Sequence, residues 1–362
     1  MADERAHISY ALQLYDDTAA HTHFDDFKIY DLKSRQPTTD RNYINHQSLP
    51  YYALGKILQL FPNWSLNSLR YASAVVAMSG YLLYLMIGRR VQLPTLDYLL
   101  YAAFPMLTYF CGIFGSANFD SFIFLGGALL YWGCLQGIKK HARYVYCLVA
   151  GMVLVSIKLT GVLTGGIFLM LIWALMKERP RWMACTFFAL VGLVCVMPYF
   201  WLFYQYGSPA PLTTGQREML AWLHHQNPAT SHWSLPHYTL NALRHFAYGQ
   251  VGAASFLPVY QCVFGMAAVG LVVQAARGPF RHRTADALEI LRSASCVAFV
   301  AVFFIQVIYC YPRYVQFAWF GDFYPRYYIA LLPGFGLFFA QGYHVLRALL
   351  VRVFKGPSRA TH

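Results

Sequence analysis

Long apolar stretches separated by short polar connections fill most of the chain. A helix of about 20 apolar residues can cross a bilayer. The stretches lack the alternation of apolar and polar residues that a membrane β-barrel requires, so they predict helices. Nine membrane segments are predicted, at 66–88, 94–114, 119–138, 143–157, 160–176, 183–205, 250–275, 289–310 and 327–350. We therefore expect an all-α, polytopic transmembrane helical bundle.

Composition supports this class, because 58% of the 362 residues are hydrophobic and only 12% are charged. Soluble domains are usually about 25% charged. The net charge of +13 is concentrated in alternate connections, which argues against a nucleic-acid partner. These basic regions are 89–90, 139–143, 177–181, 277–283 and the tail from Arg347. Lys and Arg are enriched in cytoplasmic connections. We expect the C-terminus in the cytoplasm and the N-terminal segment outside.

Three regions follow from this pattern. Residues 1–65 are expected to be a non-cytoplasmic loop with an interfacial helix at 45–61, which is short and contains Pro50 and Lys56. The transmembrane helical domain spans 66–350, with outer loops at 206–249 and 311–326. Residues 351–362 are a basic cytoplasmic tail.

The chain opens without the apolar region of a signal peptide. Either the first long helix carries the N-terminus across the membrane, or a further span precedes residue 1. We favour the second. Segments 143–157 and 160–176 are each short for a span, so we expect a tilted or broken pair with Lys158 near the outer surface.

Most candidate chemistry maps to the outer ends of the helices. The charged residues there are Asp3, Glu4, Asp120, Lys158, Arg313, Asp322 and Arg326. Transporters usually place ionisable groups at mid-depth instead. A carboxylate can accept a proton from a hydroxyl nucleophile, and Arg or Lys can bind a phosphate leaving group. The sequence therefore suggests a site at the outer membrane face.

Each candidate also has a purely structural interpretation. Asp3 and Glu4 are equally compatible with solvated loop charge. Asp120 also fits a helix cap, because acids favour helix N-termini. Lys158 and Arg326 also fit interfacial anchors whose charged ends reach toward water. No cofactor follows from the residues. A divalent cation is compatible with the sequence but is not indicated by it, and no metal ligands are assigned.

The order of several short motifs resembles the membrane-embedded GT-C glycosyltransferases, in particular the bacterial group that includes dolichyl-phosphate-mannose mannosyltransferase-like proteins. The motifs are "DERAHISYALQL", "NYINHQSLPYYALGKILQLF", "FGSANFDSFIFLGGALLYW", "VSIKLTGVL" and "YPRYYIALLPGFGLFF". The resemblance covers nearly the whole chain but rests on these short motifs. The sequence departs from the family pattern at Gln47-Ser48-Leu49 and at Phe119, where the family usually has proline.

The resemblance implies a glycosyltransferase that moves a sugar from a polyprenyl-phosphate donor to a hydroxyl by direct, inverting displacement. Asp3 would be the base, assisted by Asp120 or Glu4. Arg326 and Lys158 would bind the donor phosphate. The remaining candidate substrate-binding residues are His7, His46, Tyr51, Arg313 and Tyr327.

The same resemblance implies a bacterial inner-membrane protein whose active site faces the periplasm. Its partners would be the lipid donor, the bilayer, and a glycan, lipid or protein acceptor. Two alternatives remain open. One is a transporter or flippase for lipid-linked glycans, and the other is a non-catalytic membrane protein of glycan assembly.

Overall fold

The computed structural model describes residues 2–16, 27–34, 36–138, 144–175, 182–226, 233–248, 257–277, 286–317, 320 and 323–355. Helices dominate this part of the chain, as the sequence predicts. Among the described residues, five helices are long and apolar enough to cross a membrane: Leu66–Arg90, Ala189–Tyr206, Pro258–Arg277, Ala287–Phe317 and Pro325–Val353. The full set of nine segments stays a prediction.

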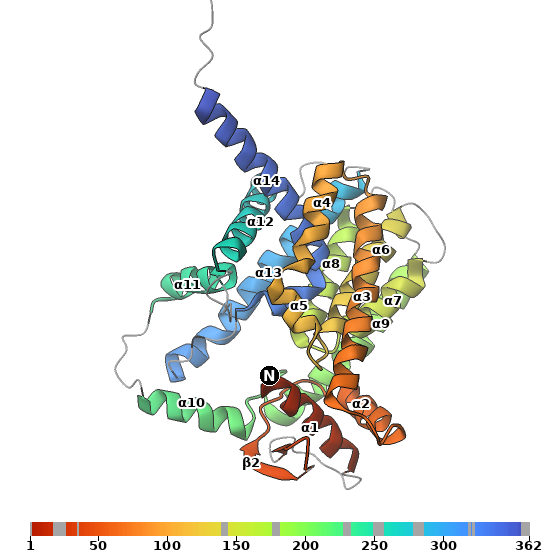
Figure 1. Cartoon of the computed structure of the whole chain (residues 1–362), viewed down its shortest axis with the longest axis vertical. Coiled ribbons are helices and arrows are strands. Elements are labelled where there is room, and N and C mark those ends of the chain that lie inside the picture. The colour runs from red at the N-terminus through yellow and green to blue at the C-terminus, as the bar shows by residue number, and fades with distance from the viewer. Residues whose placement is uncertain are drawn as a thin grey trace, which may run out of the picture.

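The N-terminal segment forms one end of the molecule, drawn lowest in Figure 1. It consists of α1 (Ala2–Asp16), β1 (Lys28–Tyr30), β2 (Pro37–Arg41) and α2 (Leu49–Leu60). The two strands pair antiparallel, with Lys28 opposite Arg41. Helix α1 lies where the sequence predicts a loop. Its residues Ala6, Tyr10 and Ala11 are buried, because they pack into the main core.

Helices α3 to α9 make the first half of the bundle, which rises from that end in Figure 1. They are α3 (Leu66–Arg90), α4 (Thr95–Ala103), α5 (Thr108–Phe114), α6 (Asp120–Ile138), α7 (Tyr144–Val155), α8 (Leu159–Leu175) and α9 (Trp182–Tyr206). A 3-10 turn, η2 (Phe104–Met106), interrupts the segment predicted at 94–114. Pro105 in this turn lacks a backbone donor, so a single straight helix is not formed there.

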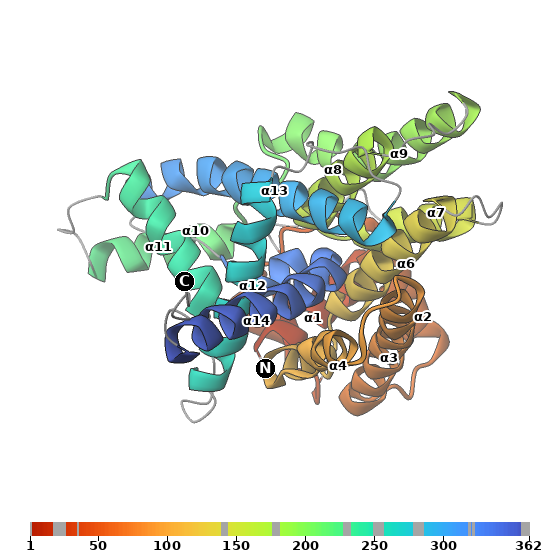
Figure 2. The ribbon, with the colours of Figure 1, turned by 90° about the horizontal axis from the view of Figure 1, so that it is seen from above.

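The second half contains α10 (Thr214–Gln226), α11 (Leu235–Tyr248), α12 (Leu257–Arg277), α13 (Ala287–Phe317), η4 (Pro325–Leu331) and α14 (Leu332–Lys355). Seen from above, α12 and α14 lie side by side (Figure 2). Two helices, α10 and α11, lie within the outer loop predicted at 206–249. Helix α13 continues seven residues beyond the predicted span end at 310.

Glycines set the closest helix contacts near the lower end. A Cβ atom at Gly127 of α6 would lie 2.3 Å from the backbone oxygen of Ala330, so only glycine lets η4 approach α6 this closely. A Cβ atom at Gly161 would lie 2.2 Å from the backbone oxygen of Val155. This second contact closes the turn between α7 and α8. The break predicted between the two short apolar segments is therefore present, and Lys158 lies in the turn.

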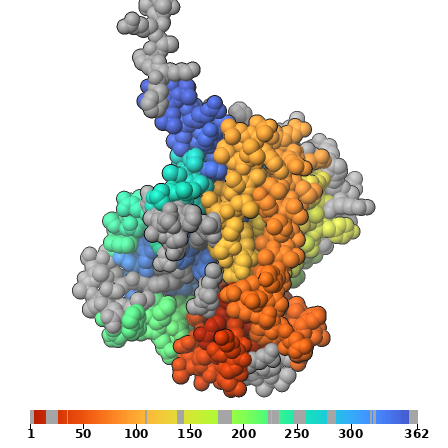
Figure 3. All heavy atoms as spheres, viewed as in Figure 1, coloured from red at the N-terminus to blue at the C-terminus, as the bar shows by residue number. Residues whose placement is uncertain are grey.

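Helix α2 turns one apolar face inward and another outward. Tyr51, Gly55 and Leu58 are buried. Leu60 and Phe61, in contrast, are 75% and 66% exposed, and they border a shallow, mainly apolar pocket of about 460 Å³. Figure 3 shows the orange atoms of this segment at the lower end, beside the red atoms of the N-terminal residues. The helix expected at 45–61 is confirmed over Leu49–Leu60, and its position in the membrane interface stays a prediction.

Candidate active site

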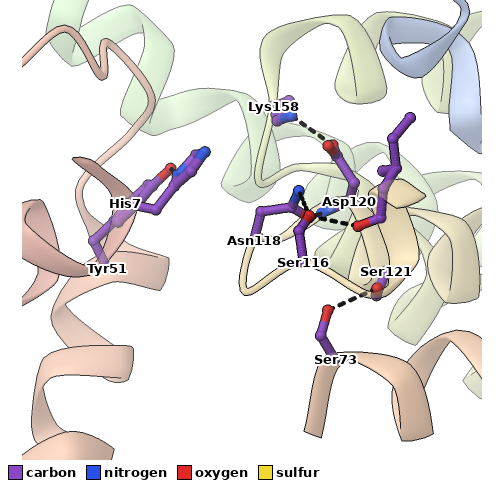
Figure 4. Close-up of polar contacts among 9 residues, drawn as sticks. His7, Tyr51, Ser73, Ser116, Asn118, Asp120, Ser121 and Lys158 are labelled. Atoms are coloured by element: carbon purple, nitrogen blue, oxygen red, sulfur yellow. Dashed lines mark hydrogen bonds and ion pairs between the residues drawn. The ribbon is translucent and has the colours of Figure 1, made fainter. Parts of the chain in front are cut away.

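Most of the predicted site residues gather at the lower end of the bundle, where five elements meet. These are α1, the start of α2, the N-terminus of α6, the α7–α8 turn and η4. Figure 4 shows His7 beside Tyr51, and Asp120 pointing toward Lys158. Residues from opposite ends of the sequence therefore share one polar region, which lies at the end that the charge pattern assigns to the outer face.

Asp120 and Lys158 form a buried ion pair. Lys158 Nζ lies 2.5 Å from Asp120 Oδ1, and the two side chains are only 7% and 2% exposed. Asp120 is the first residue of α6, where the positive end of the helix dipole stabilises a carboxylate. The backbone N–H of Asp120 donates to Asn118 Oδ1 at 2.9 Å, which orders the turn before the helix. Lys158 is thus held inside the protein, unlike an anchor that reaches toward water.

Glu4 is also buried, and both of its carboxylate oxygens accept hydrogen bonds. Arg70 of α3 donates from Nε to Oε1 at 2.8 Å and from Nη2 to Oε2 at 2.6 Å. The backbone N–H of Ala117 also donates to Oε1, at 2.8 Å. These bonds join α1, α3 and the turn before α6. They favour a positioning role for Glu4, and its predicted catalytic role stays untested.

The hydrogen bonds from Arg70 hold the pKa of Glu4 below its ordinary value, and the Ala117 N–H lowers it further. A lowered pKa in the folded protein stabilises the fold above the unfolded value, about 4.3. This contribution is lost as the pH falls through the lowered pKa. We therefore expect the hydrogen-exchange protection of α1 in the wild type to weaken as the pH falls through that range. In Glu4→Gln the protection should already be weaker at neutral pH, and it should change little with acid.

Glu218→Gln is the matched control for this prediction. Glu218 pairs with Arg41 at 3.4 Å, and both side chains are about half exposed. Exposed ion pairs contribute little to stability. Protection of α1 in Glu218→Gln should follow the wild-type pH profile. An unchanged profile in Glu4→Gln would contradict the assignment.

His7, His46 and Tyr51 form a compact group of rings. His7 Nδ1 lies 2.7 Å from the Tyr51 hydroxyl, and the two rings are nearly parallel at a centroid distance of 5.7 Å. The His46 ring stacks on His7 at 6.0 Å. Phe119, next to Asp120, meets the Tyr51 ring edge-on at 4.8 Å. The ring group therefore adjoins the start of α6.

The remaining candidates divide between two places. Arg326 lies in η4 with its guanidinium over the Tyr327 ring, 5.4 Å from the centroid, and its charge acts on His46. Arg313 instead donates from Nη2 to the backbone oxygen of Ala210 at 2.9 Å and to the Tyr309 hydroxyl at 2.5 Å. The bond to Ala210 ties α13 to the segment after α9, whereas Tyr309 lies in α13 itself. Asp3 lies in the first turn of α1, and its side chain is outside the described part of the structure.

Two contact residues were missed from the sequence, the partly exposed Arg70 and the buried Gln47. Arg70 is the single cation inside the predicted span 66–88, and a cation in an apolar segment needs a partner. This rule could have identified Arg70 from the sequence as a residue with an acidic partner. Gln47 donates from Nε2 to the backbone oxygen of Ser156 at 3.0 Å, which joins the loop before α2 to the α7–α8 turn. No local pattern marks Gln47, because its partner is 109 residues away.

Comparison of the chain with protein-family models, curated proteins and solved structures finds no match in any of the three. The GT-C resemblance therefore rests on the sequence motifs. Among the residues described, no group of three or more His, Cys, Asp or Glu is placed to hold a metal ion.

Proposed function

We propose that this chain is an integral membrane glycosyltransferase that moves a sugar from a polyprenyl-phosphate donor to an acceptor hydroxyl. The supporting observation is the convergence of the Asp120–Lys158 pair, His46 and Arg326 at one end of an apolar bundle. Carboxylate and cation lie together there, next to helices that a lipid chain can contact. The outer face of a bacterial inner membrane is the proposed location.

The chemistry requires one base and one anion-binding group. The acceptor oxygen forms a bond to the anomeric carbon, and its proton passes to a carboxylate. The bond between the anomeric carbon and the phosphate oxygen breaks, and its electron pair leaves with polyprenyl phosphate. Asp120 or Asp3 would accept the proton. Lys158 and Arg326 would stabilise the charge that develops on the phosphate.

The proposal is tested by supplying purified protein in lipid with a panel of radiolabelled polyprenyl-phosphate sugars. We expect release of polyprenyl phosphate from at least one donor, and a loss of about 10²- to 10⁴-fold in Asp3→Asn if Asp3 is the base. Equal release in wild type and Asp3→Asn would assign the base to Asp120. Release from no donor at all would contradict the proposal.

A transporter for lipid-linked glycans is the second candidate, because a buried polar group lies toward the opposite end of the bundle. Gln274 of α12 donates to Glu289 Oε1 at 2.6 Å and to Ser293 Oγ at 3.1 Å, both on α13. Asp97 of α4 pairs with His344 of α14. Polar groups between membrane helices often mark a transport pathway. Movement of labelled lipid between leaflets, without turnover of any donor, would favour this candidate.

A further inference from the structure

A series of contacts links His46 to the residues of the candidate site. The His46 ring stacks on His7, and His7 meets Phe119 edge-on at 6.5 Å. Phe119 is followed by Asp120, which pairs with Lys158. Gln47, the next residue after His46, bonds to the turn that carries Lys158. His46 therefore lies between the His7 and Tyr51 rings and the segment that contacts the Lys158 turn.

The groups around His46 are mainly cationic or neutral. Among the described residues, the His46 ring makes ring contacts and no hydrogen bond. The titratable and charged groups near it are His7 and Tyr10 from α1, Tyr51 from α2, Lys158 from the α7–α8 turn and Arg326 from η4. Asp120 from α6 joins this set as the partner of Lys158. Asp120 is the one acid in this set, and Lys158 already pairs with it.

Burial lowers the pKa of His46 well below its ordinary range, and the neighbouring Lys158, His7 and Arg326 lower it further. The ring is therefore neutral at about pH 7 when the site holds no anion. An anion bound among the same cations would raise the pKa of His46, because a nearby negative charge favours protonated histidine.

We propose that His46 takes up a proton from solution when an anionic phosphodiester headgroup binds, so that donor binding and protonation are coupled. This inference rests on the proposed function, since a polyprenyl-phosphate sugar is such a diester. One proton passes from solvent to a ring nitrogen of His46, and the ligand supplies one compensating negative charge. The protonated ring then donates a hydrogen bond to a phosphoryl oxygen.

A second feature of the site also fits this ligand. Gln47 is 4% exposed, and its Oε1 atom is buried without a hydrogen-bond partner among the described residues. A buried acceptor that lacks a donor costs free energy, so the site is complementary to a ligand that brings one. A sugar hydroxyl attached to the diester would supply that donor.

The test is calorimetric titration of purified protein in lipid nanodiscs with methyl farnesyl phosphate. This probe is a diester with no sugar to transfer and no titration near neutral pH. Titrations in two buffers with different ionisation enthalpies give the number of protons taken up. We expect about one proton per bound diester near pH 7, and a dissociation constant that rises up to about tenfold per pH unit above it.

His46→Asn and His46→Gln should both bind the diester with little proton uptake. Two variants are used so that misfolding of one does not decide the result. His237→Asn, which changes an exposed histidine of α11, should retain the wild-type uptake. Farnesol, which lacks the phosphate, should give no uptake and so measures partition into lipid.

The outcomes separate the two proposals. Binding of the diester by wild type without proton uptake would overturn the role of His46 and leave the glycosyltransferase proposal standing. Proton uptake that persists in both His46 variants would also overturn it. Failure of the wild type to bind the diester at any pH would contradict the proposed function itself.

Discussion

Asp120→Asn is expected to lower the rate of sugar transfer by about 10²- to 10⁴-fold, the usual contribution of a general base, if Asp120 rather than Asp3 is that base. Asparagine keeps the size of the side chain and its place at the start of α6, but it cannot accept the proton of the acceptor hydroxyl. Lys158→Met should lower the rate by about 10²- to 10³-fold, because the charge opposite the developing phosphate is lost. The measurement is single-turnover release of polyprenyl phosphate.

Measuring the stability of the same variants distinguishes a catalytic role of the Asp120–Lys158 pair from a structural one. Lys158→Met leaves Asp120 buried without its partner, which should cost about 3–5 kcal/mol. The double variant Asp120→Asn/Lys158→Met removes both charges, so most of that stability should return while transfer stays absent. Asp40→Asn, which changes an exposed acid of β2, should leave both rate and stability unchanged. Recovery of transfer in the double variant would show that the pair is structural.

Gly342→Leu is expected to produce the largest loss of stability outside the site. A Cβ atom at Gly342 of α14 would lie 1.8 Å from the backbone oxygen of Met266 in α12. A Cβ atom at Gly270 of α12 would lie 2.0 Å from the backbone oxygen of Phe338. Backbone atoms cannot rotate away as a side chain can. Small residues allow such close helix contacts in membranes, so leucine should force α12 and α14 apart.

We expect Gly342→Leu to destabilise the protein by at least about 1–3 kcal/mol, the usual cost of overpacking, and to lower Tm in detergent. Gly265→Leu is the matched control, because no atom lies within 4 Å of a Cβ atom at that position of α12. Leucine also favours a helix by nearly 1 kcal/mol over glycine. The control should therefore match or exceed the wild-type Tm. A wild-type Tm in Gly342→Leu would show that α12 and α14 are not in close contact.

Features that depend on neighbouring residues could be read from the sequence. The apolar stretches predicted a helical membrane protein, and five sufficiently long helices among the described residues agree with this. The two short segments around Lys158 predicted the break that the structure contains. An acid before an apolar stretch predicted a helix start at Asp120, where α6 begins. Local periodicity and helix-end preferences were enough for each of these, because the deciding atoms lie within a few residues.

The partners of the charged residues were decided by tertiary structure alone. Asp120 and Lys158 are 38 residues apart, and Glu4 and Arg70 are 66 apart. Arg313, predicted on the same grounds as Lys158, instead binds the backbone after α9. The sequence shows that each cation needs an anion or an acceptor. Which one it meets depends on how helices cross, and contacts such as those at Gly127 and Gly161 set that crossing.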